Sequence, residues 1–165
     1  MTNDQIAFRA IILAGGKGSR LGKITKKIPK PLIKIRNREF LSYLIEFLKI
    51  NHVKEIIITT SYKSKLFDEF CKKNKYKNIK IIKEKKELGT GGSFLNVLKK
   101  IRYKKNYFNI LCNADTLVLF SLNSLKKEII KNKNSILVIK KRNCERYGRI
   151  KIKGKNIIGI ERNNS

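Results

Sequence analysis

Short apolar runs rich in β-branched residues alternate along this chain with longer segments of helical periodicity. The runs predict strands at residues 8–13, 53–60, 79–84, 107–112 and 135–141. The periodic segments predict helices at residues 39–50, 63–75, 88–101 and 121–131. Strands that alternate with helices are joined by right-handed crossovers, so we expect an α/β fold with a Rossmann-like, doubly wound and mainly parallel sheet. A hairpin that turns at Gly154 is expected over 147–161.

The length of 165 residues, 41% of them hydrophobic, fits one domain over 1–165 with its own core. No apolar run is long enough to span a membrane, and the first ten residues lack the apolar core of a signal peptide. Cys71, Cys112 and Cys144 are far apart and lack metal-ligand spacing. We therefore expect reduced thiols and a cytoplasmic protein.

The formal net charge of +28 comes mostly from Lys that is spread from end to end. Nucleic-acid-binding proteins usually gather their cations in blocks or along one face, together with aromatic residues for stacking. We therefore expect no specific nucleic-acid partner, although a basic nucleic-acid-binding protein stays as a distant alternative. A positive field favours polyanionic ligands, and nucleotides are among them.

A glycine-rich segment, "LAGGKGSRLG" (Leu13 to Gly22), directly follows the first predicted strand. Its Gly15, Gly16 and Gly18 would let backbone N–H groups approach an anion that a side chain would block. The segment matches neither the dinucleotide-binding fingerprint nor the P-loop pattern. It forms either a tight turn or a phosphate-binding loop. Arg20, whose planar fork can hold two phosphate oxygens, favours the second.

The chain's two prolines, Pro29 and Pro31, flank a single lysine in "IPKPL". Each proline fixes its own φ and biases the residue before it toward extended geometry, so Lys30 is expected to have a restricted, extended backbone. A lysine held in this way can meet a phosphate without first losing chain entropy. The alternative is a polyproline-type turn with an incidental lysine.

Together, "ILAGGKGSRLGKITKKIPKPL" resembles the signature LAGGxGxRLxPxTxxxPKPL of the sugar-phosphate nucleotidyltransferases, in the same order and at nearly the same spacing. The resemblance implies the nucleotide-diphospho-sugar transferase type of fold. It also implies transfer of a nucleotidyl group from an NTP to a sugar 1-phosphate, with release of pyrophosphate, for cell-surface polysaccharide precursors. Arg20 and Lys30 are the implied catalytic residues. The implied nucleotide-binding loop contains Leu13, Ala14, Gly15, Gly16, Gly18 and Ser19.

A second glycine cluster, "ELGTGGSFLNVL", precedes a predicted helix whose N-terminal N–H groups can bind an anion or a polar ring edge. In the family a segment of this kind supports the nucleobase, which by position implies Glu84, Gly89, Thr90 and Gly91 here. "LGTGG" resembles the version in heptose 1-phosphate and mannose 1-phosphate guanylyltransferases. A carboxylate at Glu84 or Glu87 can accept hydrogen bonds from guanine N1–H and its amino group, so GTP is the expected nucleotide.

"NADT" (Asn113 to Thr116) follows the fourth predicted strand and resembles the family's N-G-D-T, with Ala114 for glycine. Mg²⁺ binds through one or two carboxylates together with substrate phosphates, so Asp115 is the expected metal ligand. The alternative for this segment is an Asx turn or a helix cap. "RYG" and "IIGIE" resemble segments beside the sugar in the family, which implies Tyr147, Gly148 and Glu161 as sugar contacts.

Catalytic domains of the family continue through a second sugar-contacting segment and a second metal-binding aspartate. We therefore expect the domain at 1–165 to be incomplete at its C-terminal end. One hypothesis is an active guanylyltransferase that uses in-line attack on the α-phosphorus, and a homo-oligomer is compatible with it. The other is a truncated or degenerate relative that binds nucleotide without turnover.

Overall fold

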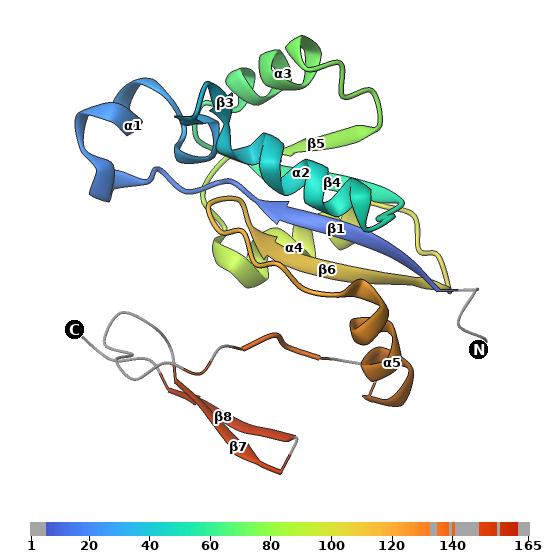
Figure 1. Ribbon diagram of the computed structural model, residues 1–165. Helices are drawn as coiled ribbons and strands as arrows, with labels where there is room; N and C mark the ends of the chain where they lie inside the picture. The colour runs from blue at the N-terminus through green and yellow to red at the C-terminus, as the bar shows by residue number, and fades with distance from the viewer. Residues whose placement is uncertain (1–5, 133–134, 139, 141–148, 155, 162–165) are drawn as a thin grey trace. The chain divides into compact units, whose positions relative to one another are not determined.

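The computed structural model describes residues 6–132, 135–138, 140, 149–154 and 156–161 (Figure 1). The chain divides into two compact units, Met1–Lys133 and Asn134–Ser165. The first unit carries the central sheet and the second a hairpin. The assignment of 1–165 to a single domain remains a prediction.

Four parallel strands form the sheet of the first unit, in the order β5-β4-β1-β6. They are β1 (Ala7–Leu13), β4 (Glu55–Thr60), β5 (Ile79–Lys83) and β6 (Tyr107–Asn113). From the central β1 the chain adds β4 and β5 on one side and then returns to add β6 on the other. The strand order therefore reverses between β1 and β6. In open α/β sheets, ligands bind outside the carboxyl ends of the strands at such a reversal.

Helices cover both faces of this sheet (Figure 1). They are α2 (Phe40–Ile50), α3 (Ser64–Lys73), α4 (Gly89–Lys100) and α5 (Leu122–Asn132). Successive side chains of a strand point to opposite faces. Ile11 and Ile57 accordingly pack with Val97 of α4. Ile12 and Ile58 belong to the larger core, which α2, α3 and α5 also line. This arrangement confirms the doubly wound α/β fold.

Two features of the second unit test the predicted strands. The expected hairpin is confirmed as antiparallel β7 (Arg149–Lys153) and β8 (Asn156–Glu161), with Gly154 at φ +62° in the turn. The fifth strand expected at 135–141 is wrong for its described residues, 135–138 and 140, which form no strand. Ile136, Leu137 and Val138 remain about half exposed. A β-branched run favours a strand only where neighbouring side chains pack against it.

Short elements that the sequence did not predict connect β1 to α2. They are η2 (Ser19–Leu21), α1 (Lys23–Lys27), η3 (Lys30–Leu32), β2 (Lys34–Ile35) and β3 (Arg38–Glu39). The antiparallel pair β2–β3 turns through Arg36 and Asn37, whose φ angles are 49° and 65°. Such positive φ values at both central residues suit the twist of a two-residue hairpin.

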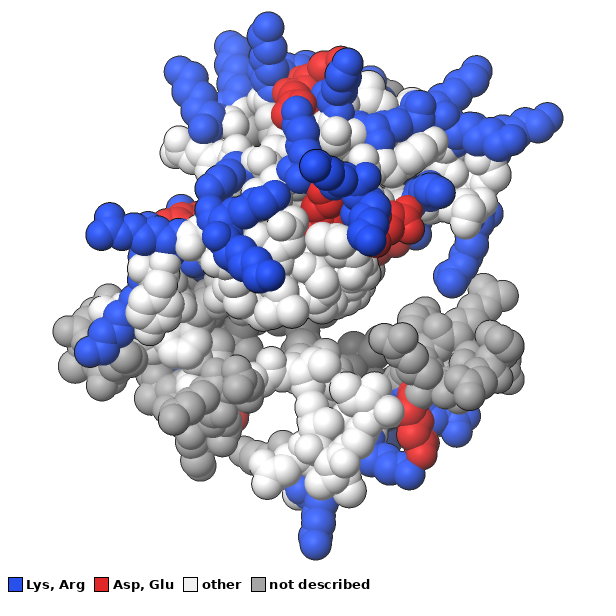
Figure 2. Space-filling view, turned by 180° about the vertical axis from the view of Figure 1, so that it is seen from behind, with Lys and Arg blue, Asp and Glu red and all other residues white. Residues whose placement is uncertain are grey.

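Lys and Arg side chains project from many separate places on the face shown in Figure 2. This distribution follows from a chain in which Lys occurs from end to end. Among the described residues, no helix combines the length and the apolar character needed to cross a membrane.

A partly buried ion pair joins β1 to β4. Arg9, which is 3% exposed, donates from Nε to Glu55 Oε2 at 2.7 Å, and Lys104 also pairs with Glu55. Burial by itself would raise the pKa of Glu55, but hydrogen bonds from Lys104 and Arg9 outweigh it and hold that pKa below its usual value. A carboxyl whose pKa is lowered by folding stabilises the fold above its unfolded-state pKa. That contribution is lost as the pH falls through the folded-state pKa.

We expect Glu55→Gln to lower the free energy of unfolding by about 2 kcal/mol at pH 7, because charge-assisted hydrogen bonds are lost. The difference from wild type should shrink as the pH falls from about 5 to 3, where the wild-type carboxyl also becomes neutral. Urea unfolding at several pH values measures this. Glu46→Gln is the matched control, since the Glu46–Arg38 pair is about half exposed on both sides. A Glu55 effect of constant size down to pH 3 would contradict the ion-pair explanation.

Candidate functional site

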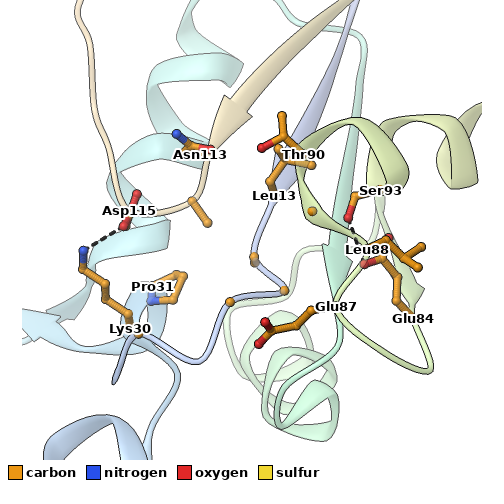
Figure 3. Close-up of a pocket in the computed structure, with 16 residues that line it drawn as sticks. Leu13, Lys30, Pro31, Glu84, Glu87, Leu88, Thr90, Ser93, Asn113 and Asp115 are labelled. Atoms are coloured by element: carbon orange, nitrogen blue, oxygen red, sulfur yellow. Dashed lines mark hydrogen bonds and ion pairs between the residues drawn. The ribbon is translucent and has the colours of Figure 1, made fainter. Parts of the chain in front are cut away.

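A cavity of about 380 Å³ lies at the carboxyl ends of β1 and β6, where the strand order reverses (Figure 3). Four segments line it: the loop after β1, the start of η3, the connection from β5 into α4, and the loop after β6. The lining residues are Leu13, Ala14, Gly15, Gly16, Gly18, Lys30, Pro31, Glu84, Glu87, Leu88, Gly89, Thr90, Ser93, Asn113, Ala114 and Asp115. In Figure 3, Lys30 and Asp115 lie on one side of the cavity, and Glu84 and Ser93 lie on the other.

The glycine loop after β1 is held through its carbonyl groups. Ser61 Oγ donates to the Gly15 carbonyl at 2.7 Å, and Thr25 Oγ1 donates to the Gly18 carbonyl at 3.1 Å. The backbone N–H groups of residues 15–18 find no acceptor among the described residues. A run of unpaired N–H groups beside a cavity is suited to bind phosphate oxygens.

Gly18 is the loop position where a side chain is least compatible with the structure. Its φ is +64°, and an added Cβ would lie 3.1 Å from Lys30 Cβ and 3.2 Å from Thr25 Cγ2. We expect Gly18→Ala to lower the free energy of unfolding by about 1–3 kcal/mol, since a non-glycine residue is strained at this φ. Chemical denaturation measures the change. Gly16→Ala is the control, because its Cβ would meet nothing within 4 Å. Equal effects at both positions would contradict the expectation.

Lys30 begins the single turn η3 rather than an extended segment. The Leu32 N–H donates to the Pro29 carbonyl at 2.9 Å, and the Ile33 N–H donates to the Lys30 carbonyl at 3.2 Å. The expected extended backbone at Lys30 is therefore wrong, whereas Ile28 is extended. The proline bias is outweighed because these hydrogen bonds form while Pro29 and Leu32 are buried. The turn holds the Lys30 side chain at the cavity.

The Lys30 ammonium and the Asp115 carboxylate form an ion pair across two distant parts of the sequence. Lys30 Nζ lies 2.7 Å from Asp115 Oδ2, and the two side chains are 41% and 38% exposed. The Ala114 N–H donates to the Leu13 carbonyl at 3.0 Å, which joins the loop after β6 to the end of β1. Ala114 is not among the residues with positive φ, so alanine fits where the family has glycine.

The electrostatic surroundings keep Asp115 ionised. Burial raises the pKa of Asp115, but the hydrogen bond and charge of Lys30, with a hydrogen bond from Thr116, outweigh it and hold that pKa below its usual value. No group of three His, Cys, Asp or Glu side chains within the described residues is arranged to hold a metal ion. Mg²⁺ can be held by one carboxylate together with water and substrate phosphates, and Asp115 stays the predicted ligand.

Glu84 and the start of α4 form the other side of the cavity. Glu84 is 7% exposed and accepts hydrogen bonds from Ser93 Oγ at 2.9 Å and from Asn96 Nδ2 at 3.3 Å. Gly89, the first residue of α4, has a φ of +67°, and no side chain caps this end of the helix. The uncapped N–H groups are available to a ligand, and the helix dipole favours negative charge there.

The cavity brings together most of the residues that the sequence predicts to bind the nucleotide, to act in catalysis or to ligate a metal. Three predicted residues are exposed and do not line it: Ser19 and Arg20 of η2, and Gly91 of α4. The roles of all these residues remain predictions.

The predicted sugar contacts belong to the second unit. Tyr147 and Gly148 lie outside the described residues. Glu161 ends β8, where it is exposed and pairs with Lys151 at 2.5 Å. Its pKa is lowered, first by the hydrogen bond from Lys151 and then by that residue's charge.

Three residues that line the cavity were not predicted as part of the site: Pro31, Leu88 and Ser93. The hydrogen bond from Asn96 to Glu84 was not predicted either. Ser93 and Asn96 lie at helical spacing, and this is the signal that could have paired them on one face of α4. Their common partner, Glu84, precedes the helix by several residues, and no periodicity connects it to them.

A doubly wound sheet with a glycine loop, a lysine and a carboxylate at its strand-order reversal defines an α/β protein whose cavity lies where such folds bind their ligands. The family model described as "Nucleotidyl transferase" matches residues 9–161, and the chain belongs to this family. The family resemblance carried by the glycine loop and "IPKPL" is thereby confirmed.

Two similar proteins are both D-glycero-alpha-D-manno-heptose 1-phosphate guanylyltransferases. The one from Campylobacter jejuni is 37% identical over 154 residues, which cover 92% of this chain and 66% of that protein. The one from Aneurinibacillus thermoaerophilus is 31% identical over 158 residues, which cover 93% and 67%. This chain therefore spans about two thirds of the length of both relatives.

A solved structure with the same fold is that of HddC from Yersinia pseudotuberculosis complexed with GMP-PN. Its TM-score to this chain is 0.79 at 30% sequence identity, and the match covers 93% of this chain and 68% of HddC. The likeness confirms the nucleotide-diphospho-sugar transferase type of fold.

Proposed function

We propose that this chain transfers a nucleotidyl group from GTP to a sugar 1-phosphate, with release of pyrophosphate. The observation that carries the proposal is the Lys30–Asp115 pair beside a glycine loop with unpaired N–H groups. Two guanylyltransferases acting on a heptose 1-phosphate are 37% and 31% identical to the chain, which favours a heptose 1-phosphate as the acceptor. Mannose 1-phosphate is the second candidate.

The two sides of the cavity suit the two ends of a nucleotide. The glycine loop, Lys30 and Asp115 would receive the phosphates, and Arg20 would add a further cation. Glu84 and the start of α4 would receive the base, because a carboxylate can accept from guanine N1–H and from the amino group at C2. The cavity of about 380 Å³ is within the usual range for small-ligand sites.

The proposed reaction is a single in-line displacement. An oxygen of the sugar phosphate forms a bond to the α-phosphorus of GTP, while the bond from that phosphorus to the bridging oxygen breaks. Pyrophosphate leaves with the electron pair. Lys30 and the loop N–H groups would hold the phosphates in line and neutralise charge that develops in the transition state. Mg²⁺ bound at Asp115 would supply further charge neutralisation on the phosphate oxygens.

Titration calorimetry with GTP and MgCl₂, followed by a pyrophosphate-release assay with heptose, mannose and glucose 1-phosphates, tests the proposal. We expect GTP to bind and pyrophosphate to appear only when a sugar phosphate is present. GTP binding without release for any sugar phosphate would instead support a nucleotide-binding relative without turnover. Salt-steep binding to random DNA, with none to nucleotides, would support the nucleic-acid alternative.

A further inference from the structure

Glu84 is a buried carboxylate whose direction is set by two side chains of α4. Its Oε2 accepts from Ser93 Oγ at 2.9 Å, and its Oε1 accepts from Asn96 Nδ2 at 3.3 Å. Its own backbone N–H donates to the Thr60 carbonyl at 2.7 Å, which fixes the main chain at the end of β5. Both the backbone and the carboxylate of Glu84 are therefore held in place.

A carboxylate has about four acceptor positions on its two oxygens. Ser93 and Asn96 use one position on each oxygen, so one position on each remains. Two adjacent free acceptors match two adjacent donors on a ligand. Guanine presents such a pair, N1–H and the amino group at C2. The corresponding edges of adenine, cytosine and uracil each mix donors with acceptors, so one of the two contacts would be lost.

We propose that Ser93 and Asn96 are positioning residues for nucleobase specificity, acting by holding the Glu84 carboxylate toward guanine. The inference rests on the proposed function, since it requires GTP as the ligand of this cavity. Ser93 is 7% exposed and lines the cavity, and Asn96 is half-buried one turn further along α4. Neither residue is proposed to contact the reacting phosphates.

The Glu84 carboxylate also lies close to the glycine loop after β1. A Cβ on Gly15 would lie 3.6 Å from Glu84 Oε2 and 3.3 Å from Ser61 Oγ. Without the Ser93 hydroxyl, the Glu84 carboxylate would keep only the longer hydrogen bond from Asn96, and its direction would be less well fixed. The base would then lose a fixed partner, while the loop, which Ser61 and Thr25 hold, would keep its N–H groups in place.

The test measures the affinities of the full chain, with Mg²⁺, for GTP, ATP and inorganic tripolyphosphate. We expect Ser93→Ala and Asn96→Ala each to weaken GTP binding about 10- to 100-fold. ATP and tripolyphosphate affinities should stay within about twofold of wild type, because neither ligand uses the guanine-directed acceptors. In steady-state assays the KM for GTP should rise, while kcat at saturating GTP stays within a few-fold of wild type.

Two further variants separate positioning from general damage to the helix. Ser93→Thr keeps a hydroxyl donor and should retain the preference for GTP over ATP. Lys99→Ala, at the exposed last turn of α4, should match wild type in all three affinities. Asn96→Asp places a second carboxylate beside Glu84 and should weaken GTP binding more than Asn96→Ala does.

Four outcomes would overturn the inference. If the alanine variants keep the wild-type ratio of GTP to ATP affinity, Ser93 and Asn96 do not set specificity, and the proposed function is untouched. If tripolyphosphate affinity falls in parallel with GTP affinity, the two residues support the fold of the site only. If wild type binds tripolyphosphate and all nucleotides equally, Glu84 does not recognise guanine. Failure of wild type to bind any nucleotide would refute the proposed function together with the inference.

Discussion

Replacing Lys30 by alanine is expected to slow pyrophosphate release about 100- to 1,000-fold. Loss of one preorganised charge-stabilising group from a transition state typically costs about 2.7–4 kcal/mol, which corresponds to this factor. The fold should tolerate the change. Lys30 and Asp115 are 41% and 38% exposed, and ion pairs with this exposure contribute at most about 1 kcal/mol to stability. The expected result is thus a large kinetic defect in a protein of nearly unchanged stability.

Steady-state kinetics and calorimetry with GTP, alongside urea unfolding, measure these quantities for Lys30→Ala. Lys26→Ala and Lys27→Ala are matched controls, because both lysines are exposed in the last turn of α1, close in sequence and outside the cavity lining. Both controls should stay within about twofold of wild type. Equal losses in all three variants would mean that Lys30 contributes only to the general positive field. Its place between two prolines would then serve the turn alone.

Replacing Asp115 by asparagine is expected to remove most of the activity and most of its dependence on Mg²⁺. The amide keeps the size of the side chain but removes the negative charge, which is the main attraction for a divalent cation. The described residues hold no group of three metal-ligating side chains that could take its place. We expect a rate loss of at least about 100-fold, of the size seen when one electrostatic contact to a transition state is lost.

Binding of Mn²⁺ in the presence of GTP, followed by electron paramagnetic resonance, gives a readout for Asp115→Asn that is independent of turnover. Asp68→Asn is the matched control, since Asp68 also pairs with a lysine, Lys83, at 2.5 Å and does not line the cavity. The control should bind Mn²⁺ and GTP as wild type does. Unchanged Mn²⁺ affinity in Asp115→Asn would show that Asp115 is not the metal ligand.

Local sequence signals were sufficient for most of the fold. The β-branched runs and helical periodicity predicted the four strands of the central sheet and its four flanking helices, because burial on one or both faces dictates those patterns. The short elements between Gly18 and Glu39 escaped prediction. Single turns and two-residue strands are too short to show a period, and hydrogen bonds such as that from Leu32 to Pro29 decide them.

The candidate site was predictable wherever backbone chemistry requires a particular residue type. Gly18 and Gly89 have φ angles of +64° and +67°, which few residues other than glycine adopt. Ser93 and Asn96 were not predictable as partners of Glu84. A serine and an asparagine are acceptable on many helix faces, and only the packing of α4 against the end of β5 brings them to one carboxylate.

The sequence by itself determined the α/β fold class, the glycine loop and the family, since each depends on residue types at short spacing. Only the tertiary structure decided that Lys30 pairs with Asp115, 85 positions further along the chain. It also decided that Glu84 lies on the opposite side of the same cavity (Figure 3). The reason is physical: strand order places β6 on one side of β1 and β4–β5 on the other, and no local pattern encodes that order.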